Sequence, residues 1–176
     1  MKSFCIVALL VLTLTGLSIN AYGGEYSGEY LIQNIESGLS LVPYRETVHK
    51  NFGRLCLYNL RNNRSVADQR WYLVDTGNGF LIKNVESGLS LVPYRETVYK
   101  NFGKLCLYNV IGTGIADQRW YFVKTAKGVL IRSAESGLSL VPYRETVHDN
   151  FGKLCLYRVN PARAVPDQQW HLVKVK

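Results

Sequence analysis

Residues 36–48 read ESGLSLVPYRETV, and the same letters recur without a single difference at residues 86–98 and 135–147. Each copy is followed by Asn-Phe-Gly, which begins at Asn51, Asn101 and Asn150. A basic residue and Leu-Cys-Leu-Tyr come next, and Asp-Gln-x-Trp closes each unit from Asp68, Asp117 and Asp167. Self-similarity at a fixed period of about 50 residues is the signature of a repeat architecture, so three tandem units organise the chain.

Each unit has the pattern of four short strands joined by turns. In the first unit these strands are predicted at residues 29–34, 39–42, 55–58 and 70–74. The second strand alternates apolar and polar residues, and we expect Pro43 to end its pairing because proline cannot donate to a ladder. No window shows sustained helical periodicity, which predicts minimal helix content.

The number and length of the repeats predict an all-β protein with a β-trefoil fold. Four strands per unit give twelve strands, and three units together can close a barrel that exposes no sheet edge. A propeller usually needs at least about four blades, and a three-unit solenoid would leave both of its ends uncapped. We therefore predict three tandem four-strand repeats with pseudo-three-fold symmetry, at about residues 29–78, 79–127 and 128–176.

The N-terminal stretch has the composition of a secretory signal peptide. A short basic start precedes an apolar run from Phe4 to Leu14 and a region of small residues that ends near Ala21. The run is too short for a membrane span, and no later segment reaches the required length. The sequence thus predicts a signal peptide at residues 1–21, a single β-trefoil domain at residues 22–176, and a secreted, extracellular protein without a membrane span.

Each repeat carries one cysteine in the same Leu-Cys-Leu-Tyr context, at Cys56, Cys106 and Cys155. Secreted scaffolds stapled by disulfides usually carry an even number of cysteines, and equivalent positions around a three-fold axis are not expected within bonding distance. We interpret these cysteines as small apolar residues on a strand. A disulfide between two molecules is the alternative.

The chain is basic, with a formal net charge of +8 at pH 7. This balance favours anionic partners such as sulfated glycans or cell surfaces. The candidate anion-binding residues are Arg45, Arg95 and Arg144. Because they recur once per unit, they spread their charge around the molecule rather than along one stripe.

The closing Gln-x-Trp element carries a resemblance to a known family. Gln69-Arg70-Trp71, Gln118-Arg119-Trp120 and Gln168-Gln169-Trp170 resemble the signature that ends each repeat of ricin B-type (R-type) β-trefoil lectins. The phrases at residues 80–83, 86–88 and 92–94 are similar to small invertebrate trefoil lectins, and the resemblance covers essentially the whole mature chain. From the residues themselves, we expect the three indoles to lie in the core with each N–H bonded locally.

The resemblance implies a sugar site in each unit, with an aromatic platform on the third strand and polar helpers beside it. The platform falls on Tyr58, Tyr108 and Tyr157. The helpers fall on Asn59, Asn109, Asp68, Gln69, Asp117, Gln118, Asp167 and Gln168, with Arg158 replacing the asparagine in the third unit. The family's acidic or histidine anchor falls on Val42, Val92 and Val141, which cannot accept hydrogen bonds from sugar hydroxyls. This departure argues against ordinary galactose-type binding.

The Tyr-Arg-Glu run that follows each of these valines offers a polar substitute. In one interpretation Arg45 and Glu46, with their counterparts, reach the ligand from the loop, and arginine suits a sulfate or carboxylate. In the other interpretation they pair with each other on a solvated turn, which contributes little. The sequence is compatible with both interpretations.

No motif of an enzyme or a metal site is present, whether a nucleophile elbow, a Gly-rich phosphate loop or a His-Glu metal motif. His49 and His148 share one loop position without acidic or thiol ligands at metal spacing, so we expect solvent-exposed histidines there. The sequence predicts a non-catalytic protein that needs no cofactor or metal. Asn63 begins the sequon Asn-Arg-Ser and is the predicted glycosylation site.

Three functions fit these observations. The first is a secreted, carbohydrate-binding, lectin-like protein. The second is a secreted salivary or venom-type effector, vasoactive or inhibitory, that acts on a host protein through the scaffold. The third is a binder of heparin-like sulfated glycans, whose binding would fall with salt. The expected partners are glycans or an extracellular protein rather than nucleic acid, and we expect a monomer.

Overall fold

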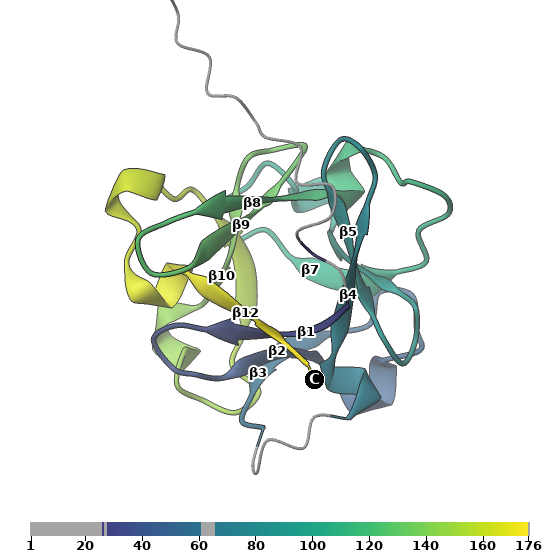
Figure 1. Cartoon of the computed structure of the whole chain (residues 1–176), viewed down its shortest axis with the longest axis horizontal. Helices are drawn as coiled ribbons and strands as arrows, with labels where there is room; N and C mark the ends of the chain where they lie inside the picture. The colour runs from purple at the N-terminus through teal and green to yellow at the C-terminus, as the bar shows by residue number, and fades with distance from the viewer. Residues whose placement is uncertain (1–25, 27, 61–65, 176) are drawn as a thin grey trace, which may run out of the picture.

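The structure is a computed structural model that describes residues 26, 28–60 and 66–175. The expected signal peptide at residues 1–21 and the sequon at Asn63 lie outside these residues. Across the described residues the chain forms twelve strands and several short 3-10 turns but no α-helix (Figure 1). No helix in this part of the chain is long and apolar enough to cross a membrane.

Each unit supplies four strands. The first unit contains β1 (Glu29–Asn34), β2 (Ser40–Pro43), β3 (Leu55–Tyr58) and β4 (Trp71–Asp75). The second unit contains β5 (Phe80–Asn84), β6 (Ser90–Pro93), β7 (Leu105–Tyr108) and β8 (Trp120–Lys124). The third unit contains β9 (Val129–Ser133), β10 (Ser139–Pro142), β11 (Leu154–Tyr157) and β12 (Trp170–Lys174). These bounds agree with the predicted strands to within one residue.

Short 3-10 turns follow the second strand and precede the fourth strand of each unit. They are η1 (Arg45–Thr47), η4 (Arg95–Thr97) and η6 (Arg144–Thr146) in the first group, and η3 (Ala67–Gln69), η5 (Ala116–Gln118) and η8 (Pro166–Gln168) in the second, with η7 (Pro161–Arg163) before η8. The expectation for Pro43 needs a correction, because Pro43 is itself the last paired residue of β2 and lies opposite Leu55. A proline is tolerated at a strand end, where its missing N–H is not needed.

Six strands close into a barrel. The first and fourth strands of the units pair in the order β1-β4-β5-β8-β9-β12, and β12 pairs back with β1. The second and third strands form three hairpins, β2-β3, β6-β7 and β10-β11. In Figure 1 the barrel strands surround the centre of the view. The closed ring confirms the predicted β-trefoil, in which no barrel strand is left as a free edge.

The core is built from the same positions of all three units. Trp71, Trp120 and Trp170 have no exposed surface, as predicted. Their indole N–H groups donate to the main-chain oxygens of Leu41, Leu91 and Leu140 at 2.9, 2.8 and 2.9 Å. Each of these oxygens belongs to the second strand of the same unit. Every tryptophan therefore fills the core and also ties the fourth strand of its unit to the hairpin.

Each hairpin has an inner face and an outer face. Leu41 and Leu57 lie opposite each other and belong to the main core, so the next pair, Val42 opposite Cys56, points the other way. A tyrosine follows two residues after Val42 and another two residues after Cys56, on that same outer face. Strand alternation thus places one valine, one cysteine and two tyrosines together on the outside of every hairpin.

The three cysteines are free and at most 1% exposed. Cys106 packs with Leu81, Val92 and Val110 in a small cluster beside the main core. Burial raises the pKa of each of the three thiols to about 12, so they stay protonated at neutral pH and present an apolar surface. This agrees with their interpretation as small apolar residues, and their burial argues against a disulfide between molecules.

The Asn-Phe-Gly turns join neighbouring units. The Phe52 N–H donates to the Leu107 oxygen at 2.8 Å, and the Leu107 N–H donates to the Gly53 oxygen at 2.9 Å. The same pattern joins Gly103 to Leu156 and, closing the circle, the third unit to the first. The three phenylalanines have positive φ angles of 62°, 62° and 65°, a conformation that bulky residues rarely adopt. These turns therefore hold a strained aromatic residue at each seam.

Substituting Gly103 by alanine is expected to weaken one of these seams. A Cβ at Gly103 would lie 2.4 Å from the Thr97 oxygen and 2.9 Å from the Lys100 oxygen, and both are main-chain atoms that cannot rotate away. We expect the free energy of unfolding, measured by urea denaturation, to fall by about 2–3 kcal/mol because the turn must distort to relieve these two contacts.

Gly112→Ala is the matched control. Gly112 has a φ of 61°, but nothing lies within 4 Å of the position that a Cβ would take there, so alanine adds backbone strain without a clash. That strain costs roughly 1 kcal/mol. A smaller loss for Gly103→Ala than for Gly112→Ala would contradict the steric role of the seam glycine.

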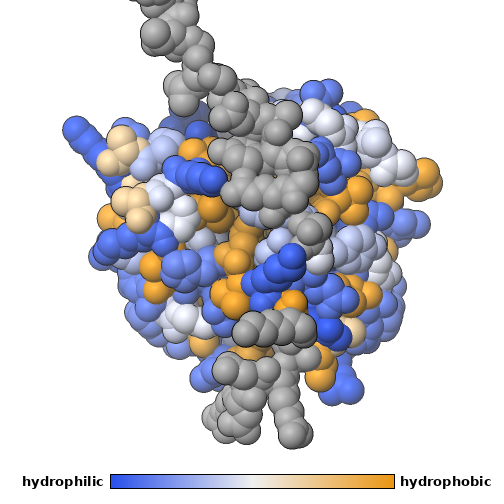
Figure 2. Space-filling view, in the orientation of Figure 1, coloured by the Kyte–Doolittle hydropathy of each residue, from blue (hydrophilic) through white to orange (hydrophobic). Residues whose placement is uncertain are grey.

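Exposed apolar side chains are few and dispersed. Figure 2 shows hydrophobic residues in small groups between hydrophilic ones on the face it displays. The seam residues Phe52, Phe102 and Phe151 are each more than half exposed. Each turn thus holds a large aromatic ring in a strained conformation and in contact with water. Because such strain is common at functional sites, the surface beside each ring is a candidate site.

Candidate functional site

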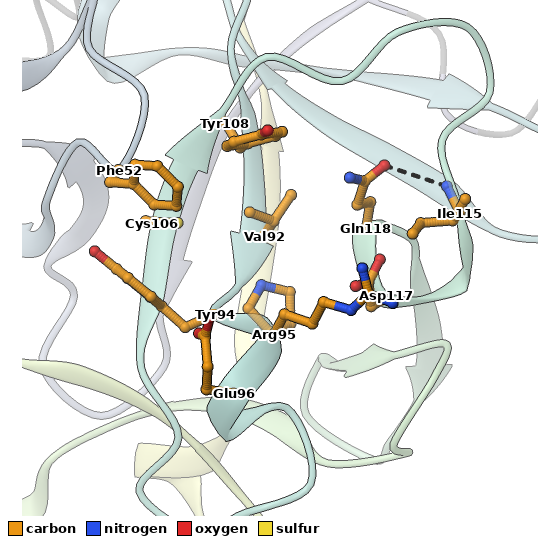
Figure 3. Close-up of a pocket in the computed structure, with 11 residues that line it drawn as sticks. Phe52, Val92, Tyr94, Arg95, Glu96, Cys106, Tyr108, Ile115, Asp117 and Gln118 are labelled. Carbon is orange, nitrogen blue, oxygen red and sulfur yellow. Dashed lines mark hydrogen bonds between the residues drawn. The ribbon is translucent and has the colours of Figure 1, made fainter.

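A shallow hollow of about 250 Å³ lies on the outer face of the β6-β7 hairpin. It is lined by Phe52, Val92, Pro93, Tyr94, Arg95, Glu96, Cys106, Tyr108, Ile115, Asp117 and Gln118 (Figure 3). In Figure 3 Phe52 and Tyr94 lie on one side, whereas Asp117 and Gln118 lie on the other. The hollow thus has an aromatic side and a hydrogen-bonding side.

The first unit repeats this hollow, with a volume of about 290 Å³. Its lining is Val42, Pro43, Tyr44, Arg45, Glu46, Cys56, Tyr58, Val66, Asp68, Gln69 and Phe151. The third unit keeps the same ring contacts, because Phe102 lies 5.7 Å from Tyr143 and 5.5 Å from Tyr157 between ring centres. The arrangement is therefore a property of the repeat.

The aromatic side of each site is shared between two units. The Phe52 ring, from the first unit, lies 5.7 Å from the Tyr94 ring and 5.5 Å from the Tyr108 ring of the second. Phe151 makes the same contacts with Tyr44 and Tyr58, at 5.6 and 5.4 Å. A site is consequently complete only when the preceding unit, or for the first site the last unit, is folded beside it.

Sequence reasoning did not predict these phenylalanines as site residues. The available signal was an aromatic residue between asparagine and glycine, repeated in all three turns at Phe52, Phe102 and Phe151. A turn residue with positive φ would be favourable as glycine or asparagine. The ring at this position packs on two tyrosines of the next unit, and phenylalanine keeps these contacts, which glycine or asparagine would lose.

The polar side of the hollow offers both donors and acceptors. The Gln118 Oε1 accepts the main-chain N–H of Ile115 at 3.2 Å, which leaves the Nε2 group of Gln118 to donate. Gln69 and Gln168 make the same contact at the start of η3 and η8. The Oδ1 atom of Asp117 is buried and has no hydrogen-bond partner in the part of the chain that the structure describes. Because this oxygen is buried, a ligand hydroxyl would meet the exposed part of the half-buried Asp117 carboxylate, which lines the hollow.

The site carboxylates are held in an unfavourable environment for their charge. Burial raises the pKa of Asp117, and Glu135 adds to the rise, whereas Arg95 opposes it. The pKa values of Asp68 and Asp167 are raised for the same main reason, with Arg45 and Arg144 opposing the rise. Each arginine therefore stands close enough to its aspartate to influence it.

The structure brings most of the predicted site residues together. Tyr58, Asp68, Gln69 and Arg45 line the first hollow, and Tyr108, Asp117, Gln118 and Arg95 line the second. In the third unit Tyr157, Asp167, Gln168 and Arg144 occupy the matching positions. Two predicted helpers, Asn59 and Asn109, are exposed and do not line the hollows. Their main-chain N–H groups donate to the side-chain oxygens of Asn150 and Asn51, both at 2.7 Å.

Charged side chains outside the linings of the two hollows make contacts across the unit boundaries. Among the described residues no ion pair joins Arg95 to Glu96, and both line the hollow. His49 Nε2 lies 3.1 Å from Glu86, and His148 Nε2 lies 3.4 Å from Glu36, while the Tyr99 hydroxyl donates to Glu135. The described residues contain no group of three or more His, Cys, Asp or Glu side chains that could hold a metal ion.

Replacing Asp68, Asp117 and Asp167 together by asparagine is expected to stabilise the protein at neutral pH. Because the pKa of each carboxyl is raised in the fold, its contribution to stability is complete below the ordinary value of about 3.9 and is lost as the pH rises through the folded-state pKa. At pH 7 the variant should gain a few tenths of a kcal/mol per site in urea denaturation, because solvent screens these half-exposed groups.

The comparison at pH 3 is the control. There the aspartates of the parent protein are largely protonated, so the two proteins should have nearly equal free energies of unfolding. A variant that is less stable than the parent at pH 7 would show that the carboxylates are net stabilising, contrary to the direction of their pKa shifts.

No protein family model matches the sequence, and no curated protein matches it either. Solved structures do match. The designed three-fold symmetric protein ThreeFoil has a TM-score of 0.73 at 20% identity, over 85% of this chain and 100% of that chain. The Rhizoctonia solani agglutinin has a TM-score of 0.67 at 20% identity, over 85% and 96%. A salivary protein from Culex quiquefasciatus of the Cysteine and Tryptophan-Rich family has a TM-score of 0.63 at 16% identity, over 85% and 94%. These similarities confirm the β-trefoil fold.

Proposed function

We propose that this protein is a secreted, non-catalytic, lectin-like module that binds carbohydrate at the two hollows and at the matching surface of the third unit. The observation that carries the proposal is the two-sided lining of the hollow beside Tyr108. Aromatic rings face Asp117 and Gln118 across this hollow, which has a volume of about 250 Å³. A pyranose has the matching form, with an apolar face that stacks on a ring and hydroxyls at its edge. The similar fold of a protein named as an agglutinin supports this assignment.

The local charge favours a neutral ligand over a polyanion. The lining of the second hollow contains one arginine, Arg95, against two carboxylates, Glu96 and Asp117, and the first hollow has the same composition. The net positive charge of the chain thus does not extend into the hollows. Sulfated glycans would meet two carboxylates beside the one arginine, which weakens their attraction to these sites.

Three sites on one body suit a multivalent surface. A shallow hollow offers limited contact area, so each site alone is expected to bind weakly. Attachment of one site raises the effective concentration of the glycan at the next and strengthens retention by roughly 10²–10⁴ where the spacing of the ligands allows it.

A glycan array that holds neutral and sulfated structures, read at low and high salt, tests the proposal. We expect retention on a neutral glycan at both salt concentrations and its loss when free monosaccharide competes. Binding only to sulfated chains, and only at low salt, would assign the function to the exposed arginines instead. Absence of binding to every glycan on the array would exclude carbohydrate binding.

A second candidate is an effector that acts on an extracellular protein. Ile111 favours it, because this side chain is 87% exposed in a loop between β7 and η5 whose sequence differs from the corresponding loops of the other units. An exposed apolar residue on a unique loop is typical of protein contacts. If Ile111→Ser abolished an effect on a protein target while glycan binding persisted, this second function would be supported.

A further inference from the structure

The floor of each hollow is apolar at its centre. Val92 and Cys106 lie opposite each other in the β6-β7 register, and both line the hollow although they are only 4% and 1% exposed. Val42 and Cys56 form the same pair in the first unit, and Val141 lies opposite Cys155 in the third. A ligand group that reaches the bottom of the hollow therefore meets carbon and a protonated thiol.

The hydrogen-bonding groups lie at one side of this floor rather than on it. Asp117 and Gln118 project from η5, across the hollow from Phe52 and Tyr94, and Val92 lies between the two sides (Figure 3). A sugar can satisfy its hydroxyls toward η5 while its opposite edge faces the rings. The part of the sugar that points down toward Val92 has no strong acceptor or donor beneath it.

Burial against such an apolar floor is unfavourable for a hydroxyl group and favourable for a methyl group. A hydroxyl pressed against Val92 would lose its bonds to water without replacement, whereas a methyl group there loses only unfavourable contact with water. The hollow, at about 250 Å³, is smaller than the sites that hold drug-sized ligands, so it has room for one sugar ring and a small substituent.

We propose that each hollow selects a pyranose that carries a methyl-terminated substituent, either a 6-deoxy carbon or an N-acetyl group, and rejects the counterpart that ends in a hydroxyl or a free amine. This selectivity rests on the proposed carbohydrate binding. Val42, Val92 and Val141 are its specificity-determining residues, and the seam phenylalanines add the apolar wall beside them.

Two matched pairs of free monosaccharides test the selectivity on the unaltered protein. L-Fucose differs from L-galactose only in lacking the 6-hydroxyl. N-acetylglucosamine differs from glucosamine only in its acetyl group when the amine is uncharged, so this pair is titrated at a pH above the pKa of the amine. Calorimetric titration should give about tenfold tighter binding for the methyl-bearing member of at least one pair. The pair that shows the difference identifies which substituent reaches the floor.

The triple variant Val42→Thr, Val92→Thr and Val141→Thr places a hydroxyl on each floor at almost unchanged volume. Its preference within the selected pair should shrink to about twofold, chiefly because the hydroxyl-bearing sugar binds better. The control is Val110→Thr with Val159→Thr. These valines are each 4% exposed in the same small clusters but line neither the first nor the second hollow, so the substitution should lower stability without changing the preference.

The outcomes separate the two proposals. Equal binding of both members in both pairs, or tighter binding of the hydroxyl- or amine-bearing members, would overturn the selectivity and leave carbohydrate binding in place. Failure of every monosaccharide and every array glycan to bind would remove carbohydrate binding and, with it, this inference. A methyl preference in the unaltered protein that persists unchanged in the valine variant would overturn the role of the floor.

Discussion

A protein in which Tyr58, Tyr108 and Tyr157 are all replaced by alanine is expected to lose its retention on an immobilised multivalent glycan. Each tyrosine ring lies 5.4 to 5.5 Å from a seam phenylalanine in the three units, and Tyr58 and Tyr108 line their hollows. Losing the ring should weaken a single site by about tenfold, or about 1.4 kcal/mol. Because multivalent retention multiplies the single-site effects, we expect the loss on a glycan surface to exceed roughly 10²-fold.

Replacing the same three residues by phenylalanine is the matched control. This variant keeps each ring and removes only the phenolic oxygen, so most of the retention should remain if stacking is the main contribution. Surface plasmon resonance on the same glycan surface, with thermal unfolding to show that all proteins are folded, provides the measurement. Undiminished retention of the alanine variant would exclude the hollows as the binding sites.

The fold could be predicted from the sequence because its determinants are local and repeated. The alternation in Leu-Cys-Leu-Tyr specifies which residues face inward, and three copies in register specify that the inward faces meet around one axis. Leu107 and Cys106 illustrate the result, since Leu107 belongs to the main core and Cys106 to a small cluster on the outer side. The burial of Trp120 follows from the same logic, since a large indole is favourable only where three units converge.

The candidate site could be predicted only in part because it crosses the unit boundaries. The helpers Asp117 and Gln118 lie in the same unit as Tyr108, and motif matching located them. Phe52 reaches the second hollow from the preceding unit, through a φ of 62° that no residue pattern specifies. Asn109 is exposed and does not line the hollow, and its main-chain N–H donates to the Asn51 side-chain oxygen of the neighbouring turn.

The family resemblance implies a polar side chain at the anchor position, where this chain has valine. The surroundings of Val92 explain why an apolar residue fits there. Val92 is held opposite Cys106 by the ladder, and their outward direction follows from the inward direction of the leucines beside them. An acid at this position would be buried beside a thiol and another valine, Val110. Desolvation of a carboxylate is costly, so the cluster as built favours an apolar residue there.

Substituting Trp120 by alanine is expected to cause the largest loss of stability among these variants. The side chain has no exposed surface, and its N–H donates to the Leu91 oxygen at 2.8 Å. Truncation leaves a cavity at the centre of the barrel and an unsatisfied buried oxygen. The free energy of unfolding should therefore fall by about 3–5 kcal/mol in guanidinium denaturation.

Trp120→Phe separates the two contributions to that loss. Phenylalanine keeps much of the buried ring but cannot donate to Leu91, so this variant should lose about 1–3 kcal/mol. Trp120 does not line the hollow, so at temperatures well below its transition the phenylalanine variant should still bind glycan. The tyrosine-to-alanine variant should show the reverse, a folded protein that does not bind. If Trp120→Phe lost glycan binding while it remained folded, the division between a structural tryptophan and a ligand-facing tyrosine would be wrong.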